Sequence, residues 1–468
     1  MKSKVFIILF FVIAWSTNVL GDSLKISINA PQLKNSELAL CAHFNGKVYK
    51  KDSLQLSAQG TGTFAQPEKL DEGLYLILIN NAKYFDVLLS DDQEFHIDID
   101  TTDFVNKNKV TGAPQSEAFN EYVQFLSGKQ QERMKLHEEG TALQAENKDV
   151  SAISEKMELL SKSVQAYQKD FFEKYDGRWV SLFFKGGEPV SGPHPVPQTQ
   201  EEADEEFLYR KVHFFDNVDL LDKRFWFTNY FPQKIEDYII KQVGGAPDSM
   251  ALAATRLVAK TMADTTCYQL MLSKLTNFAL QSNLIGMENV WAKLAEDYYL
   301  KGLASWSDST FLSDIKSEYD KISNNRIGMK GKNLVLEDSL NRKVDLYKLG
   351  GKFTLVCFYE PSCGHCKKEI PAFHEMHKKY ADKGLEVACV YLLNDKKEWV
   401  DFIKEHKLYG PHWHNLWDPK LTSRYWEYYN KTTTPALYLL NENKEIILKK
   451  FNAETMDMVL TNMLKGEK

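Results

Sequence analysis

A Cys-x-x-Cys pair at the end of an apolar run is the feature that most restricts the fold of this 468-residue chain. Residues 353–359 are almost continuously apolar, which is typical of a strand in a parallel sheet covered on both faces. Cys363 follows within four residues, and Cys366 stands at the start of an amphipathic stretch over residues 367–384. A strand that leads through such a pair into a helix predicts a redox site in an α/β domain.

The segments around this pair predict alternating strands and helices. They comprise a hairpin followed by further strands and helices, with strands at 335–337, 344–346, 385–393, 436–440 and 446–451, and helices at 398–406 and 455–464. Together with the strand and helix at the cysteine pair, the β-α-β-α-β-β-α order is similar to that of a thioredoxin domain. We therefore expect an α/β thioredoxin fold over residues 326–468.

The two cysteines have different predicted roles. Cys363 lies at the positive end of the predicted helix, which favours thiolate over thiol, so we expect it to be the attacking nucleophile. Cys366 lies one turn inside the helix, where it can attack the mixed disulfide and release the partner, so it is the predicted resolving thiol. His365 and Lys367 place positive charge beside the thiolate, which is expected to lower the pKa of Cys363 further.

Zinc binding is the alternative interpretation of the pair, because His374 and His377 follow it. His374 lies eight residues beyond Cys366 on the same predicted helix, which is roughly 12 Å at about 1.5 Å per residue. One ion held about 2 Å from each ligand cannot join side chains so far apart. We therefore expect no metal and no other cofactor.

The stretch 327–468 resembles the exported thioredoxin-fold proteins of the TlpA/ResA type. The resemblance is carried by four motifs: Ile327-Gly328-Met329-Lys330-Gly331, Gly351-Lys352-Phe353, the CGHCKKEIP block from Cys363 to Pro371, and Thr434-Pro435. It implies reversible thiol–disulfide exchange on exported proteins, often in the reducing direction. In this fold Pro435 is expected to be cis and to lie beside the nucleophile, where the backbone of Thr434 can pair with a substrate strand.

The sequence departs from the thioredoxin pattern at two places. Thioredoxins carry a buried Asp six residues before the nucleophile, and here that position is Cys357. Glu360, on the loop before the nucleophile, is the candidate replacement for the missing base. Pro361-Ser362 stands where many relatives have Trp before the first Cys. The sequence offers two interpretations of the aromatic residues that precede Pro435: they replace that wall of the substrate groove, or they fill the core of the domain. These residues are Trp413, Trp417, Tyr425, Trp426 and Tyr428.

The start of the chain predicts a signal peptide over residues 1–21. Two lysines precede an apolar run from residue 5 to residue 15, and Val19 and Gly21 are the small residues before a cleavage site. The run is too short to span a bilayer, which needs about 20 residues. Asp22 stands where a lipoprotein would need Cys, so we expect an exported, periplasmic protein that is soluble after cleavage.

The rest of the chain predicts two further domains. Residues 22–112 alternate apolar and polar side chains between turn signals, which predicts a small antiparallel β-sandwich. Residues 113–325 predict a mainly helical domain, interrupted by a Pro- and Gly-rich loop at 186–197. Neither region contains a recognisable cluster of acids, bases or nucleophiles. The cysteines at 41, 267, 357 and 389 stand in apolar runs and are expected to act as small buried hydrophobes.

The predicted function is thiol–disulfide exchange on exported proteins, most simply as a reductase recharged by a membrane electron donor. The alternatives are a binding or scaffold protein with an accessory thioredoxin domain, and a disulfide oxidase or isomerase. A peroxide-reducing enzyme is disfavoured, because the Thr-x-x-Cys pattern of peroxiredoxins is absent around Cys363. The net charge of −6 gives no indication of nucleic-acid binding.

Overall fold

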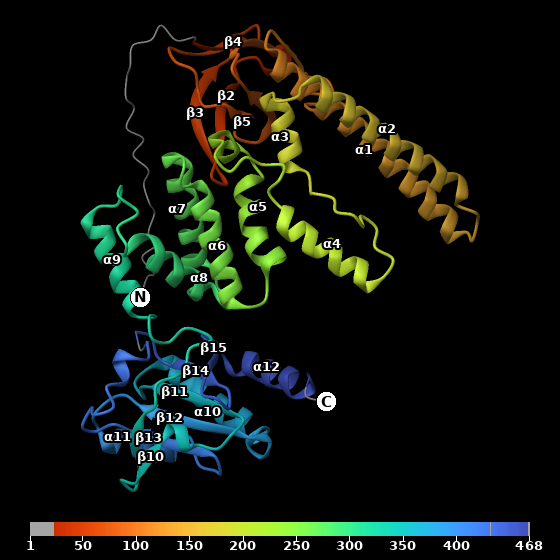
Figure 1. Ribbon diagram of the computed structural model, residues 1–468. Coiled ribbons are helices and arrows are strands. Elements are labelled where there is room, and N and C mark those ends of the chain that lie inside the picture. Colours follow the sequence, from red (N-terminus) through yellow and green to blue (C-terminus); the bar gives the residue numbers. More distant parts are fainter. Residues whose placement is uncertain (1–22, 431, 467–468) are drawn as a thin grey trace. The chain divides into compact units, whose positions relative to one another are not determined.

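Figure 1 shows a computed structural model of the chain, which describes residues 23–430 and 432–466. The predicted signal peptide, residues 1–21, lies outside the described residues. The chain divides into two compact units, one with the residues up to 242 together with 260–274, and the other with 243–259 together with 275 onward. The expected fold class is confirmed, since a C-terminal thioredoxin-like fold follows β-sheets and a helical region. The domain boundaries at 112 and 325 remain predictions.

The first unit begins with a pair of four-stranded sheets. One sheet has the order β4-β1-β7-β8 and is formed by β1 (Leu24–Asn29), β4 (Thr61–Gln66), β7 (Glu94–Asp98) and β8 (Lys109–Thr111). The other has the order β3-β2-β5-β6 and is formed by β2 (Glu37–Phe44), β3 (Lys47–Gln55), β5 (Gly73–Ile79) and β6 (Lys83–Leu89). Their apolar side chains share one core. Among the described strands of these sheets the pairs are antiparallel, except that β1 and β7 run parallel.

Helices complete the first unit. The long pair α1 (Pro114–Ala145) and α2 (Ser151–Lys174) lie side by side (Figure 1). They are followed by α3 (Trp179–Gly187), α4 (Gln200–His213), the 3₁₀ turn η2 (Lys223–Phe227), α5 (Phe231–Asp237) and a π-helical turn, Tyr238–Val243. The predicted loop at 186–197 lies between α3 and α4.

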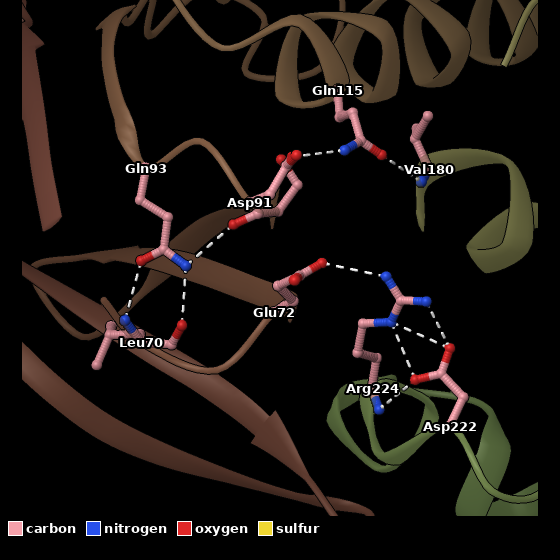
Figure 2. Close-up of polar contacts among 9 residues, drawn as sticks. Leu70, Glu72, Asp91, Gln93, Gln115, Val180, Asp222 and Arg224 are labelled. Atoms are coloured by element: carbon pink, nitrogen blue, oxygen red, sulfur yellow. Dashed lines mark hydrogen bonds and ion pairs between the residues drawn. The ribbon is translucent and has the colours of Figure 1, made fainter. Parts of the chain in front are cut away.

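Side-chain bridges join the sheets to these helices, as Figure 2 shows. The amide of Gln115 in α1 donates to Asp91 at 2.7 Å and accepts from the backbone N–H of Val180 in α3 at 3.1 Å. The guanidinium of Arg224 in η2 forms a forked ion pair with Asp222 and reaches Glu72 at 3.2 Å. These contacts join the β-sheets to α1, α3 and η2 within the first unit.

The second unit contains the thioredoxin-like fold. Helices α6 (Pro247–Thr261) and α7 (Thr265–Gln281) contribute to both units, and α8 (Met287–Leu294), a π-helical turn (Ala295–Tyr299) and α9 (Ser309–Asp320) precede the sheet. The sheet has the order β10-β9-β13-β12-β11-β14-β15. Its elements are β9 (Val335–Asp338), β10 (Lys343–Asp345), β11 (Phe353–Tyr359), α10 (Gly364–Lys378), β12 (Leu385–Tyr391), α11 (Lys396–Glu405), β13 (Trp413–Trp417), β14 (Ala436–Leu440), β15 (Ile446–Lys449) and α12 (Ala453–Gly466).

Two elements of this fold differ from the sequence-based expectation. The sequence suggests Trp413 and Trp417 only as part of a groove wall or of the core, yet residues 413–417 form strand β13, which pairs in parallel with β12 and adds a strand to the predicted order. Helix α10 begins at Gly364 and ends at Lys378, whereas the expected helix covered 367–384. Its last predicted turn is instead a short 3₁₀ segment before Gly384, which takes a left-handed φ of 89° and turns the chain into β12.

A buried ion pair connects the sheet with α8 inside the second unit. The ammonium of Lys449 in β15 contacts Glu288 at 2.5 Å and Asn325 at 2.7 Å, and its side chain is 6% exposed. Lys450 contacts the other carboxylate oxygen of Glu288 at 2.6 Å.

Among the residues that the structure describes, no helix is both long and apolar enough to cross a membrane.

We expect Glu288→Gln to lower the free energy of unfolding of this unit by about 2 to 4 kcal/mol, because it leaves the buried Lys449 without its charge partner. The control is Glu375→Gln, whose exposed pair with Lys378 is screened by solvent, so this change should lower the free energy of unfolding far less. Hydrogen exchange of β15 peptides across a urea series measures both effects. Equal losses in the two variants would contradict a stabilising role for the buried pair.

Candidate active site

The fully buried strand β11 leads directly into the cysteine motif. A tight turn follows the strand, in which the N–H of Cys363 donates to the carbonyl of Glu360 at 3.1 Å. Cys363 is the N-cap of α10, and its own carbonyl accepts from Lys367 N–H at 3.1 Å. Cys363 is partly exposed, whereas Cys366, one turn further along the helix, is 0% exposed.

Thr434 and Pro435 reach the motif from a distant part of the chain. The bond between them is a cis peptide bond immediately before β14, as expected from the sequence. β14 lies next to β11 in the sheet, so its start is close to the end of β11. The Cys363 thiol donates to the Thr434 carbonyl at 3.2 Å across 71 positions of sequence. Both Thr434 and Pro435 are half-buried.

The surroundings of Cys363 favour its thiolate. Partial burial acts to raise the pKa of Cys363, but hydrogen bonds from the Thr434 side chain and from the backbone N–H groups of Cys366 and His365 outweigh it. The net result is a pKa below the ordinary value for a thiol. These donors lie at the N-terminal end of α10, where helix N–H groups lack partners within the helix.

Cys366 has the opposite character. Burial raises the pKa of Cys366 to about 12, and the neighbouring Cys363 acts in the same direction. A thiol of this kind is protonated at neutral pH and unreactive towards solvent reagents. The pair therefore combines one accessible sulfur that is activated with one buried sulfur that is kept neutral.

Comparisons with known proteins find relatives of the domain that contains this site. Residues 327–449 match the model of the AhpC/TSA family. The thiol-disulfide oxidoreductase ResA of Bacillus cereus (strain ZK / E33L) is 30% identical over 86 residues, which are 18% of this chain and 50% of that protein. ResA of Bacillus subtilis (strain 168) is 26% identical over 120 residues, or 26% of this chain and 64% of that protein. The chain thus spans about half the length of the first curated relatives it matches.

A solved domain of a possible thiol-disulfide isomerase from Cytophaga hutchinsonii is 32% identical, with a TM-score of 0.28, and the match covers 30% of this chain and 94% of that domain. The C-terminal domain is a TlpA/ResA-like thioredoxin-fold domain. The resemblance stated from the sequence is therefore confirmed for this part of the chain.

The thioredoxin-like domain places the other candidate residues in different settings. The side chain of His365 is exposed, and its described contribution to the Cys363 thiolate comes from its backbone N–H. Glu360 contacts the motif through its backbone, and its carboxylate lies near the phenol of Tyr425. The roles predicted for these two side chains, as positive charge and as base, remain predictions.

Cys357 occupies the position at which thioredoxins carry a buried Asp. Its side chain is buried in β11 of the thioredoxin-like domain. It lies directly opposite Cys389 of β12 in the parallel register, a neighbour that the sequence does not reveal. Burial and the adjacent Cys389 thiol hold the pKa of Cys357 well above its ordinary value. Cys357 therefore cannot replace an aspartate as a proton acceptor at neutral pH.

The histidines and aromatic residues considered for other roles mainly fill the core of the thioredoxin-like domain. His374 and His377 are buried, donate to the backbone carbonyls of Tyr409 and Leu385, and pack against the ring of Trp413. Of the aromatic residues suggested for a groove wall, Trp413, Trp417 and Tyr425 are buried, Tyr428 is half-buried and Trp426 is exposed.

We expect iodoacetamide to alkylate Cys363 and spare Cys366 in the reduced chain at pH 7, because only Cys363 is both accessible and low in pKa. The reaction rate follows the thiolate fraction, so its pH midpoint lies below that of an ordinary thiol. Thr434→Val removes a hydrogen bond to the thiolate and shifts this midpoint upward. Thr433→Val, at an exposed neighbour, is the control. An unchanged midpoint in Thr434→Val would exclude a role for that side chain.

Proposed function

We propose that this chain is a thiol–disulfide oxidoreductase that acts on exported proteins through the Cys363/Cys366 dithiol, in the reducing direction. The observation that carries the proposal is the contrast between an accessible, activated Cys363 and a buried, neutral Cys366 beside the Thr434 carbonyl. The names of the curated relatives that match this domain support the same chemistry.

Reduction of a substrate disulfide takes two exchange steps. The Cys363 thiolate attacks one substrate sulfur, the substrate S–S bond breaks, and the released substrate thiolate takes up a proton. The buried Cys366 thiol then gives up its proton, attacks the sulfur of Cys363 and releases the second substrate thiol. The substrate gains two electrons and two protons, and the domain is left with a Cys363–Cys366 disulfide.

The second step determines how long the mixed disulfide lasts. Cys366 is a poor nucleophile until it loses its proton, and Cys357 stands where thioredoxins carry a buried acid. The proton can therefore pass to the carboxylate of Glu360, the predicted base, or to the departing substrate sulfur. We expect resolution to be slow relative to thioredoxin, which allows mixed disulfides to accumulate.

The direction of exchange depends on what recharges the dithiol. From the predicted signal peptide we propose that the protein acts in the periplasm, which is an oxidising compartment. A reductase there needs a continuous supply of electrons, so a membrane electron donor is part of the proposal. Disulfide- or thiol-containing exported proteins are the proposed substrates.

We expect Cys366→Ser to trap substrates, because Cys363 can still attack but the mixed disulfide is no longer resolved. Non-reducing gels of cell extracts should then show high-molecular-weight adducts that disappear when a reductant is added. The double variant Cys363→Ser, Cys366→Ser is the control and should form no adducts. Equal trapping by Cys363→Ser alone would mean that the roles of the two thiols are reversed.

We expect a reduction potential of roughly −200 to −260 mV for the Cys363/Cys366 couple. The stabilised Cys363 thiolate favours the reduced form and makes the couple more oxidising than thioredoxin, at about −270 mV. Equilibration in glutathione buffers, followed by alkylation and mass spectrometry, measures this value. A potential near −120 mV, together with an oxidised pair in cells, would identify a disulfide-forming oxidase instead.

A further inference from the structure

Two more cysteines of the thioredoxin-like domain form a pair that the proposed exchange does not use. Cys357 in β11 and Cys389 in β12 are directly paired in the parallel register of these strands. They are 1% and 0% exposed, and their thiols are hydrogen-bonded to each other. Both are free cysteines.

The position of this pair suits a disulfide bond. Paired residues of adjacent strands lie about 4.8 Å apart and project their side chains on the same face of the sheet. A disulfide requires Cα atoms about 4.4 to 6.8 Å apart. Because the two thiols are already in hydrogen-bond contact, the bond can form by adjustment of the side chains without separating β11 from β12.

The same apolar core contains the resolving thiol. Cys357, Cys389 and Cys366 belong to one cluster of buried residues, and Cys363 packs against that cluster. Ile370, from the helix that carries Cys366, lies in the cluster as well, so α10 covers the face of the sheet from which the pair projects. Four of the six cysteines thus lie around one core.

The other two cysteines belong to the other compact unit and provide an internal reference. Cys41 lies in β2 and Cys267 in α7, and both belong to the first unit. Each is buried and free. Like Cys357 and Cys389 they are buried, but they do not belong to the core cluster that contains Cys366.

We propose that Cys357 and Cys389 form a second, buried redox couple that exchanges electrons with the Cys363/Cys366 couple through Cys366. This inference rests on the proposed function, since the buried sulfurs reach substrates only through that dithiol. It gives the domain a store for a second pair of electrons. A fully reduced domain would then reduce two substrate disulfides before it needs recharging.

The exchange balances without an external reagent. In the oxidised domain, the Cys357 sulfur attacks Cys366, the Cys363–Cys366 bond breaks, and Cys363 leaves as a thiolate that takes up the Cys357 proton. Cys389 then attacks Cys357, and Cys366 leaves and takes up the Cys389 proton. One disulfide forms and one is reduced, so two electrons and two protons pass from the buried pair to the accessible pair.

Burial makes the second couple dependent on the first. The raised pKa of Cys357 keeps its sulfur in the neutral thiol form, and the absence of exposed surface keeps soluble oxidants away. The accessible couple is therefore the route by which the buried couple equilibrates with a redox buffer.

The test is a thiol count on the full chain. The protein is fully reduced, freed of reductant and exposed to excess oxidised glutathione, and samples are quenched in acid, denatured, alkylated and analysed by mass spectrometry. We expect the six free thiols to fall to four and then, more slowly, to two, which are Cys41 and Cys267. A non-reducing peptide map should contain a Cys357–Cys389 cross-link. Persistence of both sulfurs as free thiols after the first loss would overturn the inference.

Three variants test whether the second loss of thiols requires Cys389 and whether it passes through Cys366. Cys389→Ala should stop after the first loss, whereas Cys267→Ala, which removes a buried cysteine of the other unit, should still lose both pairs. The double variant Cys363→Ser, Cys366→Ser should slow oxidation of the buried pair at least about tenfold. An unchanged rate in that variant would exclude exchange through Cys366.

The same experiment distinguishes failure of this inference from failure of the proposed function. If Cys363 and Cys366 do not oxidise in a glutathione buffer, the dithiol chemistry itself is wrong. If they oxidise reversibly while Cys357 and Cys389 stay reduced, the proposed function stands and the buried pair is only part of the core.

Discussion

The burial of β11 on both faces is the constraint on which the active site depends. Every residue of the strand is buried, and the strand is held between β12 on one side and β14 on the other. Its end is thereby fixed relative to the start of β14. The turn after β11 delivers Cys363 to the N-terminus of α10, and the start of β14 delivers the Thr434 carbonyl to the same sulfur. A loose strand would separate these groups, since they are 71 positions apart in the sequence.

The sequence predicts this part of the fold well, because its signals are local. The limits of β11 and β14 follow from short apolar runs, and the position of Cys363 follows from the strand-to-helix change of pattern. Other features depend on partners distant in sequence. Strand β13 contains His414 and Asn415 between tryptophans, and only its register with β12 makes it a strand. The ion pair between Glu288 and Lys449 is equally invisible without the fold.

The candidate site likewise combines features that follow from the local sequence with features that only the fold reveals. The different characters of Cys363 and Cys366 are predictable, because a helix N-terminus and one helical turn suffice to expose one sulfur and bury the other. The source of the stabilisation is less predictable. The sequence suggests the charge of His365, but the structure shows its side chain exposed and a backbone N–H turned to the sulfur. Position in the sequence therefore indicates which sulfur is activated but not which atoms activate it.

Cys357, at the position where thioredoxins carry a buried acid, affects both the packing of the core and proton transfer from Cys366. A carboxylate in this core would lose its hydration and would have to be compensated by hydrogen bonds, whereas a thiol beside the Cys389 thiol is a small, nearly apolar group. The core is therefore easier to pack with Cys357, but it lacks the buried carboxylate that serves thioredoxins as proton acceptor. Cys357 also stands against Cys389 in the strand register, which is the observation behind the proposed second redox couple. Under the proposed function, a site without this buried carboxylate resolves mixed disulfides slowly, and slow resolution suits selective exchange better than rapid general reduction.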